Sequence, residues 1–226
     1  MSKNLIKLME NQVSEMGNAI APPLVFPTFE SETITAYELG LKTDLLDGRV
    51  RANIAAFLYD YEDLQFQATD PDVFRGGVAN IPESEMKGVE IEFLALLSDS
   101  WSLDVNMAFL DSEITEDYDT LDNVKAGPYF FGQEDIRYSL RENINGNELA
   151  KSPNFTANAS LTYQSDLAAG HNVSGSFEIV HRGEFQQRVI NNTSIDKVND
   201  YTLVNVVASI QPANSAWSYS LMVFNA

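Results

Sequence analysis

Apolar residues occupy nearly every second position between Glu38 and Gln65, and the dipeptide Asp47-Gly48 interrupts the pattern near its middle. A period of two places alternate side chains on opposite faces of a β-strand. An Asp-Gly pair favours a tight hairpin turn, because glycine accepts the positive φ angle that such a turn needs. The segment therefore predicts two long antiparallel strands with a common apolar face, which either a second sheet or lipid must cover.

The same alternation returns along the rest of the chain, so the sequence predicts an all-β fold of about eight strands in an antiparallel meander. The clearest example is the run from Trp101 to Phe109, in which large apolar residues alternate with small or polar ones. The second strand departs from the pattern, because its other face becomes aromatic at Phe57, Tyr59 and Tyr61, which a purely polar lumen does not predict. The predicted strands begin near Thr33, Arg49, Met86, Trp101, Phe155, Val173, Tyr201 and Trp217.

The connections between these strands alternate between short and long. Short turns are predicted at 46–48, 98–100, 166–172 and 212–216, and long loops at 62–85, 116–154 and 190–200. In a meander this places every short turn at one end of the sheet and every long loop at the other, which is typical of an outer-membrane barrel. The longest loop is rich in Asp, Asn, Gly and Glu and is predicted to be irregular.

Two other architectures also fit the alternation. A soluble β-sandwich, such as an adhesin-like or carbohydrate-binding module, would seal Trp101, Val105 and Phe109 under a second layer. A complete porin-like barrel of eight strands would have to pair its last strand with its first, and the last strand lacks a closing aromatic terminus. In the outer-membrane barrel the same apolar side chains would face lipid.

Composition excludes several classes of function. Thirty-three acidic residues against fourteen basic ones give a formal net charge of -19, which would repel nucleic acid. Cysteine is absent, so disulfides and thiolate chemistry are excluded. His171 and His181 lack the spacing of a metal pair, and the acidic run 111–122 lacks the glycine and glutamate of a calcium loop. We expect no catalytic residue, no metal site and no cofactor, and we expect the acidic run to be a solvated external loop.

Several short motifs occur along the chain in a fixed order. They comprise a Glu-Leu-Gly-x-Lys strand, an Asp-Gly turn, a Tyr-x-Asp strand end, an Asn followed by Lys-Gly-Val-Glu, and a Trp strand that ends in Asn. Their residues are Glu38, Leu39, Gly40, Lys42, Asp47, Gly48, Tyr61, Asp63, Asn80, Lys87, Gly88, Val89, Glu90, Trp217 and Asn225. In order and spacing, over about residues 30–225, the chain resembles the C-terminal part of the β-barrel of TonB-dependent outer-membrane receptors.

This resemblance implies a partial transmembrane barrel from a protein of the roughly 22-stranded, plugged type, in the outer membrane of a Gram-negative bacterium. Such a receptor imports a scarce nutrient, for example an iron-siderophore, and contacts TonB through its plug domain. The chain would then be a fragment, with a loop or short helix at 1–30 and the partial barrel at 31–226. The plug, a signal peptide and one closing strand would lie outside it, and the long loops would form part of the ligand-capture surface.

The polar face of the predicted strands would line the lumen of such a barrel. Charged and amide side chains on this face either hydrate the wall or contact a ligand as it passes. The candidates for ligand contact are Arg51, Glu90, Glu92, Asp104, Asn106 and Glu178.

Overall fold

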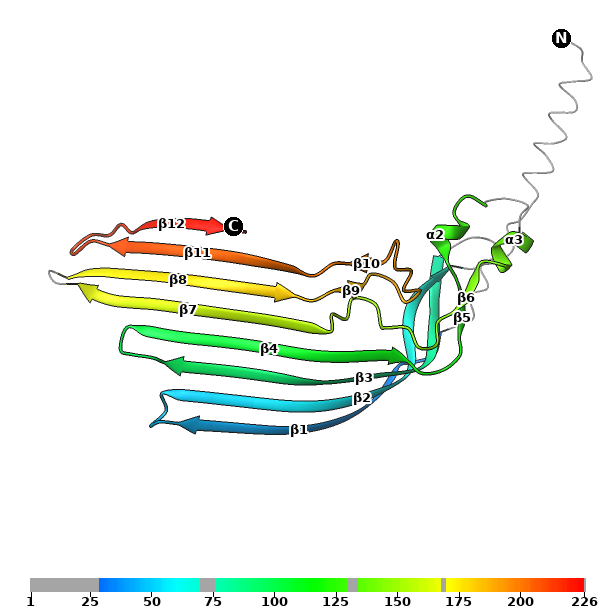
Figure 1. Ribbon diagram of the computed structural model, residues 1–226, viewed down its shortest axis with the longest axis horizontal. Coiled ribbons are helices and arrows are strands. Elements are labelled where there is room, and N and C mark those ends of the chain that lie inside the picture. The colour runs from blue at the N-terminus through cyan, green and yellow to red at the C-terminus, as the bar shows by residue number, and fades with distance from the viewer. Residues whose placement is uncertain (1–28, 70–75, 130–133, 168–169, 226) are drawn as a thin grey trace, which may run out of the picture.

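The main element of the fold is one antiparallel sheet of eight strands, seen in a computed structural model that describes residues 29–69, 76–129, 134–167 and 170–225 (Figure 1). The strands follow one another in chain order, which confirms the predicted meander. They are β1 (Thr33–Leu45), β2 (Val50–Thr69), β3 (Gly76–Leu96), β4 (Trp101–Ile114), β7 (Phe155–Leu167), β8 (His171–Arg182), β11 (Tyr201–Gln211) and β12 (Tyr219–Phe224). The helix predicted within residues 1–20 lies outside the described residues.

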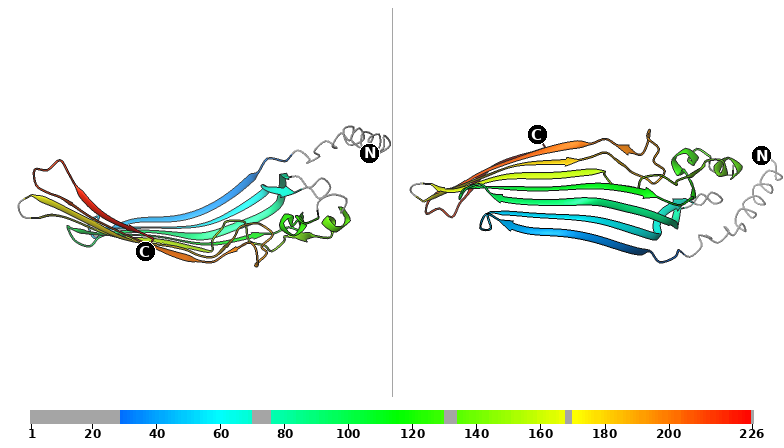
Figure 2. Two further views of the ribbon diagram at one scale, coloured as in Figure 1. Left: turned by 90° about the horizontal axis from the view of Figure 1, so that it is seen from above. Right: turned by 60° about the horizontal axis from the view of Figure 1, so that its bottom comes forward.

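The connections are sorted by length, as the sequence predicted. The short turns lie at one end of the sheet and the longer connections at the other (Figure 1). The sheet is also curved and twisted (Figure 2), as strands with the right-handed twist of L-residues require. At Asp47 and Gly48 the φ angles are 54° and 81°, so the Asp-Gly pair forms the tight turn expected of it.

The two faces of the sheet differ in character along its whole width. One row of paired residues crosses six strands and is apolar throughout: Ala52, Phe93, Val105, Ala159, Ile179 and Val204. We call this side the apolar face. The side that carries Asn53, Glu92 and Asn106 is the polar face.

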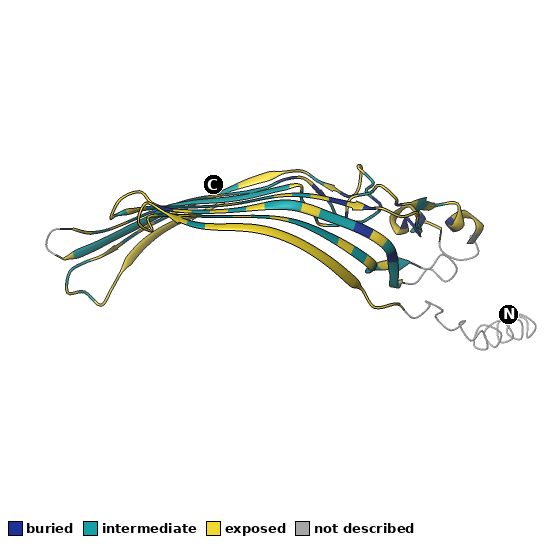
Figure 3. Ribbon diagram, turned by 90° about the horizontal axis from the view of Figure 1, so that it is seen from below, coloured by how far each residue is buried: buried dark blue, intermediate teal, exposed yellow. Residues whose placement is uncertain are grey.

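No second layer covers the apolar face within the described part of the chain. The exposed fraction of Trp101 is 42% and that of Phe109 is 48%, and most buried residues lie at the end of the sheet that carries the long loops (Figure 3). The soluble sandwich is therefore contradicted, because it would have sealed these side chains.

The hairpin of β2 and β3 is longer than the sequence predicted. The segment 62–85 was expected to be a loop, but pairing continues from Leu64 opposite Ile81 to Thr69 opposite Gly76. The hairpin bends sharply (Figure 1) beside Asp63, whose φ angle is 58°. The residue across from this position is Pro82, which has no N–H to donate to the ladder. On β2 the extension does alternate, with Leu64, Phe66 and Ala68 separated by polar residues, whereas residues 76–80 on β3 show no such pattern.

Asn80, a residue of the sequence motifs, fixes this bend. Its Nδ2 donates to the carbonyl oxygens of Asp63 (2.6 Å) and Glu30 (3.1 Å), and its Oδ1 accepts from the backbone N–H of Glu30 (2.9 Å). The side-chain amide of Asn80 therefore links Asp63, whose backbone is in the left-handed conformation, to Glu30 in the segment before β1.

The other long connections contain small elements of their own, so the prediction of an irregular span at 116–154 was wrong in part. Short strands pair locally there, and apolar side chains of these connections, such as Leu121 and Ile144, are buried. The small elements are β5 (Asp119–Leu121), α2 (Asn123–Ala126), α3 (Glu134–Tyr138), β6 (Arg141–Asn143), β9 (Phe185–Gln186) and β10 (Lys197–Val198). The sixth predicted strand, expected to reach about Val189, ends at Arg182, and the last begins at Tyr219.

The hydrophobic core lies beneath the long loops rather than along the length of the eight-stranded sheet. Its buried members come from β3, β4 and the two connections that follow β4 and β8, and Met86 and Tyr118 pack against them. They are Ile81, Ile114, Ile144, Leu149 and Ile190. Ile114 and Met86 are in register with the polar face, so the loops fold over the polar face at this end of the sheet.

The aromatic residues on the polar face have a packing role. Phe57 is paired with Gly88 across β2 and β3 and stacks on Tyr59 with ring centroids 4.8 Å apart. A Cβ atom added to Gly88 would lie 2.6 Å from Phe57 Cζ and closer still to the carbonyl oxygen of Phe109. The glycine of the Lys-Gly-Val-Glu motif is therefore required by the ring that covers it.

We expect Gly88→Ala to destabilise the barrel by about 1–3 kcal/mol, the usual cost of overpacking, because a backbone carbonyl cannot move aside cheaply. Urea unfolding of the intact protein measures this. The matched control is Gly40→Ala on β1, where the added Cβ would meet only the carbonyl oxygen of Ile54 at 3.6 Å. Equal unfolding midpoints for the two variants would contradict the assigned role of Gly88.

Candidate functional site

Four of the six predicted site residues lie together on the polar face. Arg51, Glu92, Asp104 and Asn106 line a hollow of about 320 Å³ together with Asn53. Asn53 Nδ2 donates to Glu92 Oε2 (2.9 Å), and Asn106 Nδ2 donates to Asp104 Oδ1 (2.5 Å). The strands hold these side chains in adjacent rows, because their residues are paired across β2, β3 and β4.

Arg51 has a second partner, Glu90 lines another hollow together with Glu92 and Asn106, and Glu178 lies apart from the group. Arg51 Nε also donates to Asp44 Oδ1 (2.8 Å) in an exposed ion pair. Glu90 lies between Ala55 and Ala108 on the neighbouring strands. Glu178 is separated from the group by β7 and accepts hydrogen bonds from Asn158 (3.0 Å) and Asn205 (2.8 Å). This part of the polar face is thus acidic, and its carboxylates accept hydrogen bonds from neighbouring amides.

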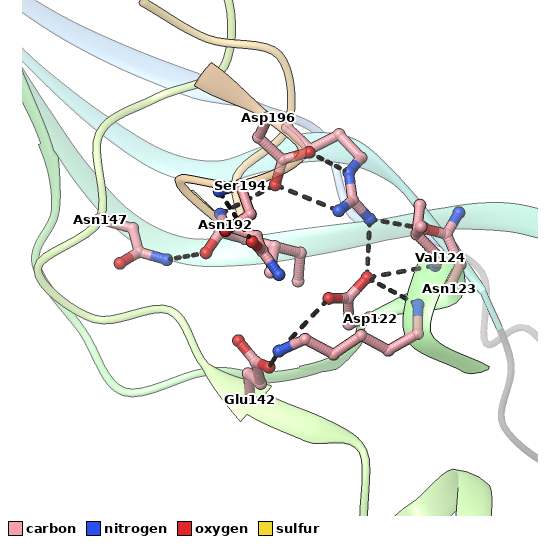
Figure 4. Close-up of polar contacts among 11 residues, drawn as sticks. Asp122, Asn123, Val124, Glu142, Asn147, Asn192, Ser194 and Asp196 are labelled. Carbon is pink, nitrogen blue, oxygen red and sulfur yellow. Dashed lines mark hydrogen bonds and ion pairs between the residues drawn. The ribbon is translucent and has the colours of Figure 1, made fainter.

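The residues that sequence analysis missed lie in the external loops, centred on Arg188. This guanidinium donates from Nε to Asp196 Oδ1 (2.6 Å) and from Nη2 to Asp196 Oδ2 (3.1 Å). Its Nη1 donates to Asp122 Oδ1 (2.9 Å) and Asn123 Oδ1 (2.7 Å). Figure 4 shows Asp122 and Asp196 on two sides of this group. We call Asp122, Arg188 and Asp196 the loop clamp, since it joins two connections that are far apart in sequence.

Asp122 is the buried end of the loop clamp. Its side chain is fully buried and caps α2 by accepting from the backbone N–H groups of Val124 (3.1 Å) and Lys125 (3.4 Å). Lys125 in turn forms an ion pair with Glu142 on β6. The acidic run was expected to be solvated throughout, and for Asp122 that expectation was wrong because Arg188 reaches it from another loop.

The charges of the loop clamp stabilise one another. Burial raises the pKa of Asp122, but hydrogen bonds from Arg188 and from the backbone of Lys125 and Val124 outweigh it and bring the pKa below its ordinary value. Burial likewise lowers the pKa of Arg188, and its hydrogen bonds to Asp196 and Asp122 outweigh that and raise it. Both groups therefore stay ionised at neutral pH.

Next to the loop clamp lies a pocket of about 340 Å³ formed by four segments that are distant in sequence. The end of β2, the β5–α2 region, a two-residue stretch before β7 and the stretch after β9 each contribute to it. Its lining consists of Phe66, Gln67, Thr69, Thr120, Leu121, Asn123, Ala150, Lys151, Gln187, Arg188, Val189 and Ile190. Among the described residues, no group of three or more His, Asp or Glu side chains is arranged to hold a metal ion.

Comparison with known proteins establishes the family. The sequence family described as "TonB dependent receptor-like, beta-barrel" matches residues 10–226. The chain belongs to this family. Its barrel is accordingly an outer-membrane barrel of a Gram-negative bacterium, and the family comprises receptors and transporters. No helix in the described ranges is long and apolar enough to cross a bilayer.

Individual relatives of this TonB-dependent receptor barrel agree with that assignment. The probable TonB-dependent siderophore receptor PiuA of Acinetobacter baumannii is 29% identical over 87 residues, which are 38% of this chain and 11% of that protein. The ferric yersiniabactin uptake receptor FyuA of Yersinia pestis superposes with a TM-score of 0.63 at 20% identity, covering 86% of this chain and 24% of FyuA.

A second solved structure gives the same result. The ferric preacinetobactin receptor BauA of A. baumannii superposes with a TM-score of 0.56 at 18% identity, covering 85% of this chain and 25% of BauA. These likenesses show the fold. The chain thus spans about a quarter of the length of the solved receptors that it matches.

Proposed function

We propose that this chain forms part of the wall and external surface of a TonB-dependent receptor that captures and imports a ferric siderophore. The observation that carries the proposal is the set of long loops, which fold over the polar face of the sheet on a shared hydrophobic core and leave a pocket among them. A binding surface at the mouth of a barrel is what a capture step needs. The names of FyuA, BauA and PiuA, all siderophore receptors, support this cargo.

The remaining partners follow from the two faces of the sheet. The apolar face would contact outer-membrane lipid, because the outward face of an outer-membrane barrel is an apolar band that lies in hydrocarbon. The polar face, with Glu90, Glu92, Asp104 and Asn106, would line the route of the ligand, and Arg51 and Glu178 would lie beside it. TonB would act through a plug domain of the full-length receptor. The protein would act as a transporter and not as an enzyme.

Uptake of radioactive iron tests the proposal. The full-length protein that contains this chain is expressed in a Gram-negative strain that lacks its own siderophore receptors and is given a panel of ferric siderophores. We expect uptake of at least one of them, and we expect its loss when the tonB gene is deleted. Absence of uptake across the panel, with the protein present in the outer membrane, would refute the proposed cargo.

A further inference from the structure

The polar face is least polar at its β11–β12 end. Two rows of paired residues cross this face from β4 to β12, and both are polar as far as β8 and end in a large apolar side chain. They are Ser102, Thr162, Ser176, Val207 and Met222 in one row and Asp104, Ser160, Glu178, Asn205 and Phe224 in the other. A third row begins with Asn106 and Asn158 and ends in Val180 and Leu203. The apolar members of the three rows, which we call the inner strip, are Val180, Leu203, Val207, Met222 and Phe224.

The last strand, β12, is apolar on both of its sides. Residues 221–224 form an uninterrupted apolar run. Leu221 and Val223 are paired with Ala208 and Val206 on the apolar face, so Met222 and Phe224 point to the other side. An unbroken apolar run is typical of a strand that is buried on both faces. The run therefore indicates a cover over the inner side of β12 as well as over its outer side.

The described part of the chain leaves the β12 residues of the inner strip uncovered. The exposed fraction of Phe224 is 63% and that of Met222 is 54%. A strand that paired with the outer edge of β12 would lie beside these side chains and not over them, because side chains stand roughly perpendicular to a sheet. Asn205 lies between Leu203 and Val207, and its amide donates to Glu178 Oε2 (2.8 Å) and accepts from the backbone N–H of Asn225 (3.2 Å). An apolar cover would thus leave neither end of this amide unpaired.

The occupant that fits the inner strip is a plug domain of the same receptor. A barrel of the roughly 22-stranded type has a lumen wide enough to hold a plug. This chain spans about a quarter of the solved receptors that it matches, which leaves ample chain for such a domain. A passing ligand would cover the inner strip only during transport, and Phe224 and Met222 would face water at all other times at a cost in free energy. A resident partner removes that cost permanently.

We propose that the plug is anchored on the inner strip through an apolar patch of its own, with Phe224 as the main contact. This inference rests on the proposed function, because it requires the chain to be part of the wall of a plugged transporter. It adds which part of the wall holds the plug. The polar rows on β4, β7 and β8 then form a hydrated side of the lumen, next to the hollow around Asp104 and Asn106.

Photo-cross-linking in the full-length receptor tests the contact directly. The photoreactive residue p-benzoylphenylalanine is placed at position 224, and at position 176 as the matched control, because Ser176 lies on the same face in the row of Met222. After irradiation of outer membranes, mass spectrometry identifies the joined peptides. We expect position 224 to cross-link to a plug peptide of the same polypeptide and position 176 to give a much lower yield. The probe exchanges one aromatic ring for another at position 224, so the barrel should assemble normally.

Channel conductance of the full-length receptor in planar lipid bilayers tests the anchoring role. Phe224→Ser should raise the fraction of time for which the channel conducts about tenfold or more, as loss of a buried aromatic contact weakens an interface. The matched control is Leu221→Ser, which removes an apolar side chain from the opposite side of the same strand and should leave the conductance at the wild-type level. Gel mobility before and after heating shows that both barrels are folded.

The outcomes separate this inference from the proposed function. A plug cross-link at position 224 together with a leaky Phe224→Ser channel supports the anchor. Equal yields at positions 224 and 176, no cross-link at 224, or a cross-link there to an external loop or to another protein would overturn it. Equal conductance of Phe224→Ser and Leu221→Ser would also overturn it, because the effect would then come from damage to the strand. Neither readout uses a siderophore, so these results do not depend on the proposed cargo, which the uptake experiment tests by itself.

Discussion

Replacing Arg188 with Met should release the external loops from one another, because the change removes one partner of a buried charge and keeps the length of the side chain. Asp122 would remain fully buried without its guanidinium, and loss of one partner of a buried ion pair costs about 3–5 kcal/mol. Lys125 Nζ lies 3.7 Å from Asp122 Oδ2 but already contacts Glu142, so it compensates only in part. Hydrogen exchange of the full-length protein should show lost protection within 116–154 and 183–200.

The control for this prediction is Arg51→Met. Arg51 is also paired with an aspartate, Asp44, but the two side chains are 60% and 57% exposed. Exposed pairs of this kind contribute less than about 1 kcal/mol, so exchange of the external loops should stay at the wild-type level. If Arg188→Met and Arg51→Met give the same exchange pattern, the loop clamp does not hold these loops together.

The second large effect is expected from Val105→Arg on the apolar face. Val105 lies midway along the apolar run of β4, and an arginine on the lipid side of a barrel costs about 2–4 kcal/mol near the bilayer midplane. Assembly of the full-length protein in the outer membrane should fall, and folding into lipid vesicles should show a lower midpoint in urea. Membrane fractionation and denaturant titration measure the two effects.

The neighbouring residue provides a matched control of opposite orientation. Asn106→Arg places the same side chain on the polar face, next to Glu92 and Asp104, where carboxylates and water can accommodate it. Its free energy of unfolding should stay within about 0.5 kcal/mol of the wild-type value, as is usual for surface substitutions, so its urea midpoint should barely change. If Asn106→Arg were the more damaging variant, the assignment of the two faces would be reversed.

The wall and the loops of this protein are stabilised by different interactions. The eight-stranded sheet is a single layer whose side chains pack across strand pairs, and within the described residues no second layer covers its apolar face. The loops carry a core of their own in Ile81, Ile114, Ile144, Leu149 and Ile190, together with the loop clamp. Variation of loop contacts can therefore change ligand recognition without altering the register of the wall, a division that suits a receptor family with many ligands.

The sequence was most informative where structure is a local property. Period-two alternation placed Val105 and Asn106 on opposite faces, and Asp47-Gly48 placed the first turn, because side-chain direction in a strand depends only on position along it. The motif residues Gly88 and Asn80 were also identified from sequence, although their roles beneath Phe57 and at the bend of β2 needed the structure.

The sequence alone thus predicted the eight main strands, their order, their two faces and the sorting of loops by length, but not the extension of the second hairpin or the short strands within the loops. Only the tertiary structure decided which loop residues meet. Asp122 and Arg188 are 66 positions apart, and the pocket around Lys151 draws on four separate segments. Polar loops carry no periodic signal, and their contacts depend on which loops the barrel brings side by side. For that reason Asp122 was expected in solvent and is found buried beneath an arginine.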